Sequence, residues 1–536
     1  MSTSAPASGA APSNSARVNW RLIFAIAGCS LAARVLADVV VDPVPSGDEA
    51  IVGLMARHIL LQGERPVFYY GQDYLGSLEA YLAAACFALF GESTAALRLT
   101  PLLFWSGYVV LMGWLASQMI GARLAPIAAL LATIASPVVL YHARQAFGGS
   151  GAEMLCLGTA QLALAVAIAR KEQPKGRRRW LLPSAFGLVV GLSLWVHFLS
   201  AVYTLAAALY VLAARGRRLG QELPGYLAAA LAVAIGFAPA LIWNATNGWR
   251  SFTFLAFIVG GSGSAQEGEP TLTLERLSRI AGEGLVAAVG ARNDWDTWLA
   301  LPWHESVPFL SGAVLLLYVA FFLVWVATRL RSPALAGVQA FDLVVLVAAL
   351  NLAFFLPLRF GPEGPIVRYL LPLSGVAPLA AAWFLGRLLT YRRALYAGAL
   401  ALLLVHNGYF SGMLLTSGTL YPIAALRGWL EAARLTRVYS SYWIAYPLVF
   451  ASQERIIASP AQPLLSLGTY PDSERYPPYT RLVREASDPV FVFDRQKAEG
   501  QLFARRLADE GITYRLDVVA ERFLVFRCFS DDLPGA

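Results

Sequence analysis

The feature that most constrains this chain is a series of apolar segments, each close to the length that crosses a bilayer as one helix. Only 14% of the 536 residues are charged, whereas about a quarter of a soluble protein is charged. The sequence therefore predicts an α-helical polytopic membrane protein with about 11 transmembrane helices. The expected spans are residues 20–41, 96–118, 124–141, 152–169, 181–197, 199–214, 223–243, 307–328, 341–358, 369–388 and 394–416.

The distribution of positive charge predicts how these spans are oriented. With the N-terminus in the cytoplasm, nearly all clustered Lys and Arg fall in cytoplasmic loops, as the positive-inside rule requires. In this topology residues 181–214 form two spans, because a single span would place the basic segment 215–222 outside the cytoplasm. The net charge of +8 then comes from these loops and does not indicate a nucleic-acid partner. The expected extracytoplasmic loops are residues 42–95, 142–151, 244–306 and 359–368.

Two regions differ from the membrane domain, residues 17–416. Residues 1–16 carry no charged side chain and are rich in Ser, Ala, Pro and Gly, which predicts a disordered tail. Residues 417–536 regain charge and predict a small extracytoplasmic α/β domain with a docking or acceptor-shaping role. Its β-like runs are 436–443, 455–459, 488–494 and 521–528, and its helical segments are 424–435 and 495–512.

The four cysteines are scattered through the chain, and three of them lie inside apolar runs. This pattern predicts buried thiols without a disulfide framework or a metal site. They are Cys29, Cys86, Cys156 and Cys528.

The first extracytoplasmic loop contains the densest set of polar residues. Asp48 and Glu49 precede residues 50–61, which have helical periodicity. Such acids either cap a helix or act as catalytic carboxylates, and the local sequence leaves both roles open. Aromatic and polar side chains then alternate, as in an interfacial aromatic belt or in a sugar-binding site. The candidates for binding the sugar or the acceptor are Tyr70, Gln72, Asp73, Tyr74 and Glu79.

These features together resemble a known family. A first span, a loop that opens with an Asp-Glu pair, a helix and then YYGQDYLGSLEAYL resemble the polyprenyl-phosphate-sugar-dependent C-type glycosyltransferases. That superfamily includes the protein O-mannosyltransferases and the lipid A aminoarabinose transferases. The likeness extends over residues 20–390 and includes LYHARQAFGGSGAEM and VRYLLPLSGVAPL. Relatives often carry an acid earlier in the helix after HARQ than Glu153, so the role of this residue stays open.

The resemblance implies sugar transfer from a lipid-borne donor, because nucleotide sugars are absent outside the cytoplasm. Asp48 is then the base that takes the proton of the acceptor hydroxyl, and Glu49 positions the acceptor or tunes Asp48. Direct displacement would invert the anomeric configuration. The resemblance also implies that the acceptor is a lipid, a glycan or a protein and that the membrane is the inner membrane of a bacterium.

The departing phosphate requires a cation. Arg368 is the first choice because its guanidinium pairs with two phosphate oxygens, although an interfacial anchor is the alternative. His197 is expected to be a hydrogen-bonded residue at a helix end. The candidates for binding the donor phosphate are, in order, Arg368, then Arg144 with His142, and then Arg57 with His58.

No cofactor is expected. Asp294 and Asp296 have the Asp-x-Asp spacing of metal-dependent nucleotide-sugar enzymes, but an arginine neutralises a single phosphate, so a divalent metal is not favoured. These acids fit better in an interfacial helix or an acceptor groove. Two other functions stay open: a transporter or lipid flippase, and a scaffold that acts through residues 417–536.

Overall fold

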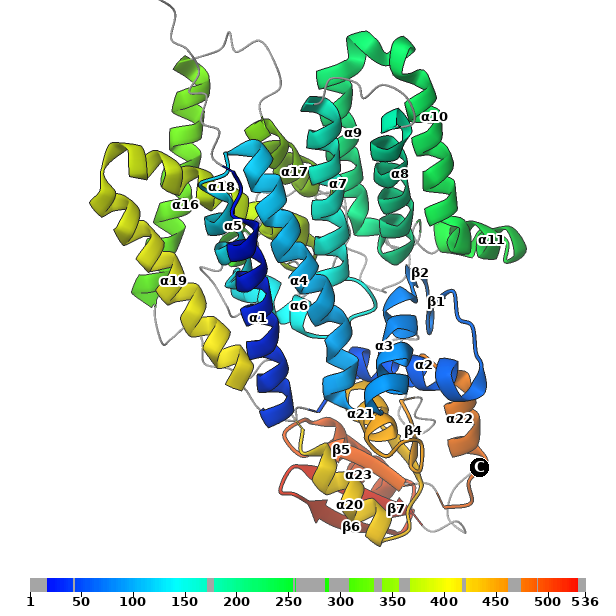
Figure 1. The fold of residues 1–536 in the computed structure, drawn as a ribbon. Coiled ribbons are helices and arrows are strands. Elements are labelled where there is room, and N and C mark those ends of the chain that lie inside the picture. Colours follow the sequence, from blue (N-terminus) through cyan, green and yellow to red (C-terminus); the bar gives the residue numbers. More distant parts are fainter. Residues whose placement is uncertain are drawn as a thin grey trace, which may run out of the picture.

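The computed structural model describes most of a helical bundle and a domain at one of its ends. Figure 1 shows the bundle helices side by side, with the C-terminal domain, coloured yellow to red, packed beneath the first loop. The described residues are 17–41, 44–170, 178–253, 256, 285–288, 308–331, 340–355, 367–416, 421–460, 474–488 and 490–528.

Seven of the described helices are long and apolar enough to cross a membrane. Two further pairs of helices form bent units, with angles of 69° in the first pair and 61° in the second. A proline in the first turn of the second helix of each pair explains the breaks, because proline lacks the N–H that would continue the helix. The seven helices are α1 (Trp20–Val41), α4 (Thr94–Met119), α7 (Ala152–Arg170), α9 (Ala201–Arg215), α16 (Pro308–Arg331), α18 (Leu371–Tyr391) and α19 (Arg393–Thr416).

The remaining described bundle helices are bent or short. The bent pairs are α5 (Ala125–Thr133) with α6 (Pro137–Arg144), and α10 (Leu219–Gly236) with α11 (Ala238–Thr246). Helices α8 (Arg178–Val196) and α17 (Ala340–Phe355) are apolar, but the stretches considered as spans, Trp180–Val196 and Asp342–Phe354, are shorter than those of the seven long helices. Each of the eleven expected spans thus corresponds to a described helix or bent pair, and the break expected between 197 and 199 is present. The short pieces are η1 (Phe198–Ser200), η2 (Gly216–Arg218), α14 (Val286–Ala288) and η4 (Val367–Leu370).

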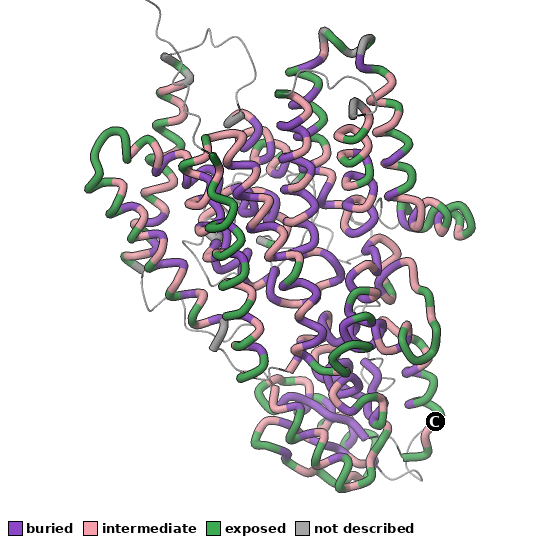
Figure 2. Tube along the Cα trace, viewed as in Figure 1, coloured by how far each residue is buried: buried purple, intermediate pink, exposed green. Residues whose placement is uncertain are grey.

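The outside of the bundle is apolar. Leu36 of α1, Leu231 of α10 and Leu316 of α16 are each more than 60% exposed. Figure 2 shows long exposed segments on the outward-facing helices α1 and α19. Helices that present such side chains outward belong in lipid, and the protein is therefore a multi-pass membrane protein.

Polar groups inside the bundle are paired across helices. Tyr108 of α4 donates to the carbonyl oxygen of Gly375 at 2.8 Å, and Tyr203 of α9 donates to that of Pro372 at 3.1 Å. Both tyrosines are fully buried. These bonds fix α4 and α9 to the first turns of α18, because a buried hydroxyl needs a partner.

The first loop folds into a compact unit between the bundle and the C-terminal domain. It comprises α2 (Gly47–Gln62), the antiparallel hairpin β1 (Phe68–Tyr69) and β2 (Gln72–Gly76), and α3 (Leu78–Phe90). The hairpin is attached to the bundle, since Leu75 forms a β-bridge with His197 and the Trp195 indole donates to the carbonyl oxygen of Val67 at 3.1 Å.

The C-terminal domain has a five-stranded sheet with strand order β4-β3-β5-β7-β6. The first three strands in this order are parallel, and β7 is antiparallel to both neighbours. This confirms the predicted α/β domain. Its elements are α20 (Ile423–Ala432), β3 (Arg437–Ser440), α21 (Tyr442–Ala451), β4 (Ile457–Ser459), α22 (Pro477–Arg484), β5 (Val490–Asp494), α23 (Glu499–Asp509), β6 (Tyr514–Val519) and β7 (Phe523–Cys528).

Candidate active site

The two neighbouring acids of the first loop have different partners. Ser46 caps α2 by accepting from the Glu49 N–H at 3.4 Å, and the Glu49 carboxylate accepts in return from the Ser46 N–H. Glu49 thus completes the capping box. The Asp48 side chain takes no part in this cap and is only half-buried. The structure thereby assigns the cap to Ser46 and Glu49 and leaves the Asp48 side chain outside it.

Glu49 belongs to a buried cluster of charges, which we call the bundle cluster: Asp38, Glu49, Arg98 and Arg144. Arg98 donates to both Glu49 oxygens, at 2.7 and 2.8 Å, and to Asp38 at 3.0 Å. Arg144 donates to Asp38 at 2.7 Å and to the carbonyl oxygen of Leu414. All four side chains are less than 10% exposed. These contacts favour a structural role for Glu49 and Arg144, in place of the acceptor and phosphate contacts that the resemblance implies.

A second cluster, the domain joint, links α2 to the C-terminal domain. The Arg57 guanidinium pairs with Glu92 and, at 2.7 Å, with Glu454. The His58 ring, fully buried, contacts the Tyr70 hydroxyl at 2.9 Å and Glu454 at 3.0 Å. These bonds favour a domain-docking role for Arg57, His58 and Tyr70, in place of the expected donor and sugar contacts.

Arg368 remains available to a ligand. It is exposed in η4, stacks 5.0 Å from the Tyr369 ring and donates to its hydroxyl at 3.1 Å. No carboxylate of a described residue forms an ion pair with it. Its charge acts on Asp48 and on Tyr74. The described structure therefore gathers the first-choice base, the first-choice phosphate ligand and Tyr74 in one region.

Tyr74 is close to several charged groups of this region. Its hydroxyl interacts electrostatically with Asp48, Arg368 and Arg475. Burial, together with the neighbouring Tyr369, raises the pKa of Tyr74 to about 12, so the phenol is a hydrogen-bond donor at neutral pH.

The other expected sugar-binding residues are spread around the hairpin. Asp73 pairs with Arg250 at 3.3 Å. With its amide oxygen turned toward the guanidinium, Gln72 accepts from Arg475 at 2.8 Å. Neither contact requires a ligand, so a sugar would have to compete for both side chains.

Glu79 lies in the first turn of α3, just after the hairpin in the chain. It accepts from the Gly149 N–H at 3.0 Å and contacts the Glu153 carboxyl. Burial, together with the charge of Glu153, raises the pKa of Glu79 well above its usual range. The pair can hold a shared proton, because two carboxylates so close cannot both ionise readily.

Two expected histidines lie near Arg368, His142 buried and His197 half-buried. Both His142 and His197 interact electrostatically with the positive charge of Arg368. The Nδ1 atom of His197 accepts from the Leu199 N–H at 3.0 Å, which agrees with the expected helix-end role. His142 lies at the end of α6, beside Arg144.

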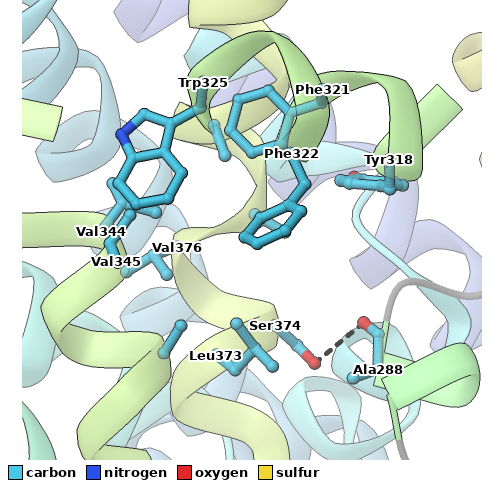
Figure 3. Close-up of a pocket in the computed structure, with 13 residues that line it drawn as sticks. Ala288, Tyr318, Phe321, Phe322, Trp325, Val344, Val345, Leu373, Ser374 and Val376 are labelled. Carbon is cyan, nitrogen blue, oxygen red and sulfur yellow. Dashed lines mark hydrogen bonds between the residues drawn. The ribbon is translucent and has the colours of Figure 1, made fainter. Parts of the chain in front are cut away.

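An apolar cavity of about 180 Å³ opens between α16, α17 and α18. Figure 3 shows the aromatic side chains of α16 facing Leu373, Ser374 and Val376 of α18. The Ser374 hydroxyl donates to the carbonyl oxygen of Ala288 at 2.9 Å, which leaves an apolar surface. Leu373 follows Arg368 by little more than one helical turn, so an apolar chain and its anionic head group would find adjacent partners.

Several expectations fall outside the described residues. Asp294 and Asp296 lie there, as do most of the loop 244–306 and residues 359–366. Within the described part of the chain, no group of three or more His, Cys, Asp or Glu is placed to hold a metal ion. The expectation about metal stays a prediction.

Two residues near Asp48 were not foreseen from the sequence, namely Tyr442 and Arg475 of the C-terminal domain. Tyr442 donates to the Asp48 Oδ1 atom at 2.5 Å. The Arg475 guanidinium lies 5.7 Å from the Tyr442 ring. No motif marks either residue, because their distance from Asp48 in the sequence hides the contact.

Comparisons with known proteins agree with this fold. Residues 77–243 match the family described as dolichyl-phosphate-mannose-protein mannosyltransferase. No curated protein matches the chain in a sequence comparison. Among solved structures, ArnT from Cupriavidus metallidurans bound to undecaprenyl phosphate is similar, with a TM-score of 0.60 and 15% identity over 97% of this chain and 99% of that one.

A second solved structure is more distant. The archaeal oligosaccharyltransferase AglB from Archaeoglobus fulgidus, in complex with an inhibitory peptide and a dolichol-phosphate, has a TM-score of 0.53 and 14% identity. The match covers 96% of this chain and 75% of AglB. These likenesses confirm the predicted fold over nearly the whole chain, and the family match agrees with the resemblance seen in the sequence.

Proposed function

We propose that this protein is a membrane glycosyltransferase that moves one sugar from a polyprenyl-phosphate donor to an acceptor hydroxyl outside the cytoplasm. The observation that carries the proposal is the electrostatic interaction between Asp48 and Arg368, together with an apolar cavity lined by the first turn of α18, which follows Arg368 in the chain. The family match over residues 77–243 and the likeness to two structures that contain polyprenyl phosphates support it.

Asp48 acts as the general base in this proposal. The acceptor oxygen attacks the anomeric carbon while its proton passes to the Asp48 carboxylate. The bond between the anomeric carbon and the phosphate oxygen breaks with its electrons on the phosphate, so one displacement inverts the configuration. Glu49 is an unsuitable base, because Arg98 occupies both of its carboxylate oxygens.

Arg368 binds the phosphate of the donor. A guanidinium keeps its charge near lipid and offers several N–H groups to phosphate oxygens, so it stabilises the charge that the leaving group gains. The cavity beside η4 would hold part of the prenyl chain. In this arrangement a cationic side chain replaces the divalent metal, and no cofactor takes part.

The orientation is part of the proposal. The basic loops place the N-terminus in the cytoplasm and the C-terminal domain outside it, in the inner membrane of a bacterium. A donor carried on a lipid is required there, and the acceptor is a lipid, a glycan or a protein.

Transfer from labelled undecaprenyl-phosphate sugars by the purified protein in lipid nanodiscs tests the proposal. Asp48→Asn is expected to abolish transfer while retaining undecaprenyl phosphate binding, and Asp488→Asn, an exposed acid of the C-terminal domain, serves as the matched control. Normal transfer by a folded Asp48→Asn variant would remove Asp48 as the base.

The phosphate ligand has its own test. Arg368→Ala is expected to weaken undecaprenyl phosphate binding at least tenfold, because an Arg–phosphate contact contributes about 1.5 to 3 kcal/mol. Arg387→Ala is the control, since Arg387 lies near the end of α18, the helix that follows η4, and also stacks on an aromatic ring. Equal binding by the two variants would rule out this clamp.

A transporter or flippase is the second candidate, because the bundle cluster is a set of buried charges near the membrane. Its residues lie at helix ends: Asp38 in the last turn of α1, Arg98 in the second turn of α4 and Arg144 at the end of α6. They therefore gather at the end of the bundle near α2 and mark no path across it. Translocation in proteoliposomes without a covalent product would favour transport.

A further inference from the structure

The C-terminal domain contacts the candidate base directly. The Tyr442 hydroxyl donates to the Asp48 Oδ1 atom at 2.5 Å, and the Tyr69 hydroxyl donates to the Asp48 main-chain oxygen at 3.1 Å. Tyr442 begins α21 just after β3 ends at Ser440. It thus projects from the carboxyl end of a parallel strand, the edge where α/β domains commonly present functional side chains.

The packing of α21 on α2 fixes this contact. A Cβ atom at Gly47 would lie 2.6 Å from the Tyr442 ring, and one at Gly53 would lie 2.5 Å from the Phe450 ring. Both α2 positions therefore need glycine for the two helices to approach as they do. The Tyr442 ring also meets Tyr446 edge-on, with the ring centroids 5.2 Å apart. These neighbours leave the hydroxyl little freedom to turn away from Asp48.

Arg475 completes the surroundings of Tyr442. Its main-chain N–H donates to the Tyr446 hydroxyl at 2.6 Å, and its guanidinium lies beside the Tyr442 ring. Burial, followed by the charge of Asp48, raises the pKa of Tyr442 well above its usual range. The phenol therefore keeps its proton and acts only as a donor to the carboxylate.

We propose that Tyr442 is a positioning residue for catalysis, which holds the Asp48 carboxylate through Oδ1 so that Oδ2 faces the acceptor hydroxyl. The C-terminal domain then completes the catalytic site in addition to any contact with the acceptor. This inference rests on the proposed function, because it assumes that Asp48 is the base.

Removing only the hydroxyl tests the proposal. Tyr442→Phe keeps the ring that packs on Gly47 and is expected to lower kcat by about 10- to 100-fold, since a base without its aligning bond loses the productive orientation. The KM for the donor should stay within about twofold, because Tyr442 makes no contact with the phosphate site. Loss of a charge-assisted bond to the carboxylate also favours its protonated form, so the acidic limb of the pH–rate profile should move to higher pH. Tyr439→Phe, in β3 of the same domain, is the matched control.

A double-mutant cycle separates positioning from general folding. On an Asp48→Asn background, Tyr442→Phe should cause no further loss of residual transfer, because its effect passes through the carboxylate. Gly47→Ala gives a second perturbation, since the added methyl group must displace the Tyr442 ring. It should lower kcat in the same direction while the melting temperature shows that the protein is folded.

The outcomes distinguish the two proposals. If Asp48→Asn is inactive while Tyr442→Phe keeps the wild-type kcat and pH profile, the positioning role is wrong and the proposed function stands. Additive losses in the cycle would also overturn positioning. If Asp48→Asn transfers sugar normally, the base assignment itself fails.

Discussion

Two clusters of charged side chains lie near the two ends of α2, and they differ in burial and in composition. The bundle cluster joins two arginines to two carboxylates, with each side chain less than 10% exposed. In the domain joint, Arg57 and Glu454 are nearly a fifth exposed, and a histidine and tyrosines complete the contacts. The stability that the bundle cluster contributes should therefore depend strongly on each of its members. The domain joint should tolerate the loss of a member better, and its contribution to stability should change with pH. Among the described residues, no member of either cluster forms a hydrogen bond or an ion pair with the Asp48 side chain, which accepts from Tyr442 instead.

The largest effect is expected from breaking the bundle cluster. Arg98→Ala leaves Glu49 and Asp38 without their shared partner, and removing one side of a buried ion pair costs about 3 to 5 kcal/mol. The detergent-solubilised variant should therefore melt at a much lower temperature than the wild type, or fail to accumulate. The double variant Arg98→Met with Glu49→Leu should recover part of the loss, because it leaves fewer buried charges uncompensated. A wild-type melting temperature for Arg98→Ala would contradict the structural role of this cluster.

A smaller effect is expected at the domain joint. Glu454→Ala removes the acceptor that Arg57, His58 and Tyr479 share, at an expected cost of about 1 to 2 kcal/mol because solvent reaches the vacated site. Hydrogen exchange should quicken in α21 and α2 and stay unchanged in α18. If hydrogen exchange quickened equally throughout the bundle, the domain joint would stabilise the bundle itself as well as the docking of the C-terminal domain.

The joint also predicts a pH dependence. Burial by itself would raise the pKa of Glu454, but hydrogen bonds from His58, Arg57 and Tyr479 outweigh it and lower the value from 4.5 to about 2. A carboxyl with a lowered pKa stabilises the fold above its unfolded pKa, and this stabilisation is lost as the pH falls from about 4.5 to about 2. The wild type should therefore lose about 1 kcal/mol more than Glu454→Gln across this window, measured by thermal unfolding in detergent. Parallel pH curves for the two proteins would contradict the assignment.

The helical bundle was predictable because a span of a bilayer requires a long apolar segment, and loop charge then sets the order of the spans. The sheet was mostly predictable too, since β3, β4, β5 and β7 lie within the expected runs. Strand β6 was missed because this edge strand is largely exposed and lacks an apolar pattern. Helix α21 was missed because it is buried between α2 and the sheet, so all of its sides are apolar and no helical period appears.

The residues of the candidate site also include some that the sequence could identify and some that it could not. Asp48 and Arg368 stand in local motifs, so the sequence could identify them. Tyr442 could not be identified, because it belongs to the helix without periodicity and meets Asp48 only through domain packing. Asp38 and Arg98 carried a signal, since charged residues in apolar segments are costly unless paired. Which acid each arginine pairs with follows only from the packing of α1, α2, α4 and α6.

The smallest effect is expected at a pair with neither burial nor a network. Arg506 of α23 and Glu510, the residue that caps this helix, lie one turn apart, with N and O atoms 2.9 Å apart, and both side chains are about a third exposed or more. Exposed pairs of this spacing contribute about 0.3 to 0.5 kcal/mol, which salt reduces further. Arg506→Ala should therefore leave the melting temperature nearly unchanged at 0.15 M salt. If Arg506→Ala destabilised the protein as much as Glu454→Ala, burial and shared acceptors would not explain why the bundle cluster, the domain joint and this exposed pair differ in their effect on stability. Close agreement with the wild type would leave burial as the property that separates them, because all three sites join the same kinds of charged groups at similar distances.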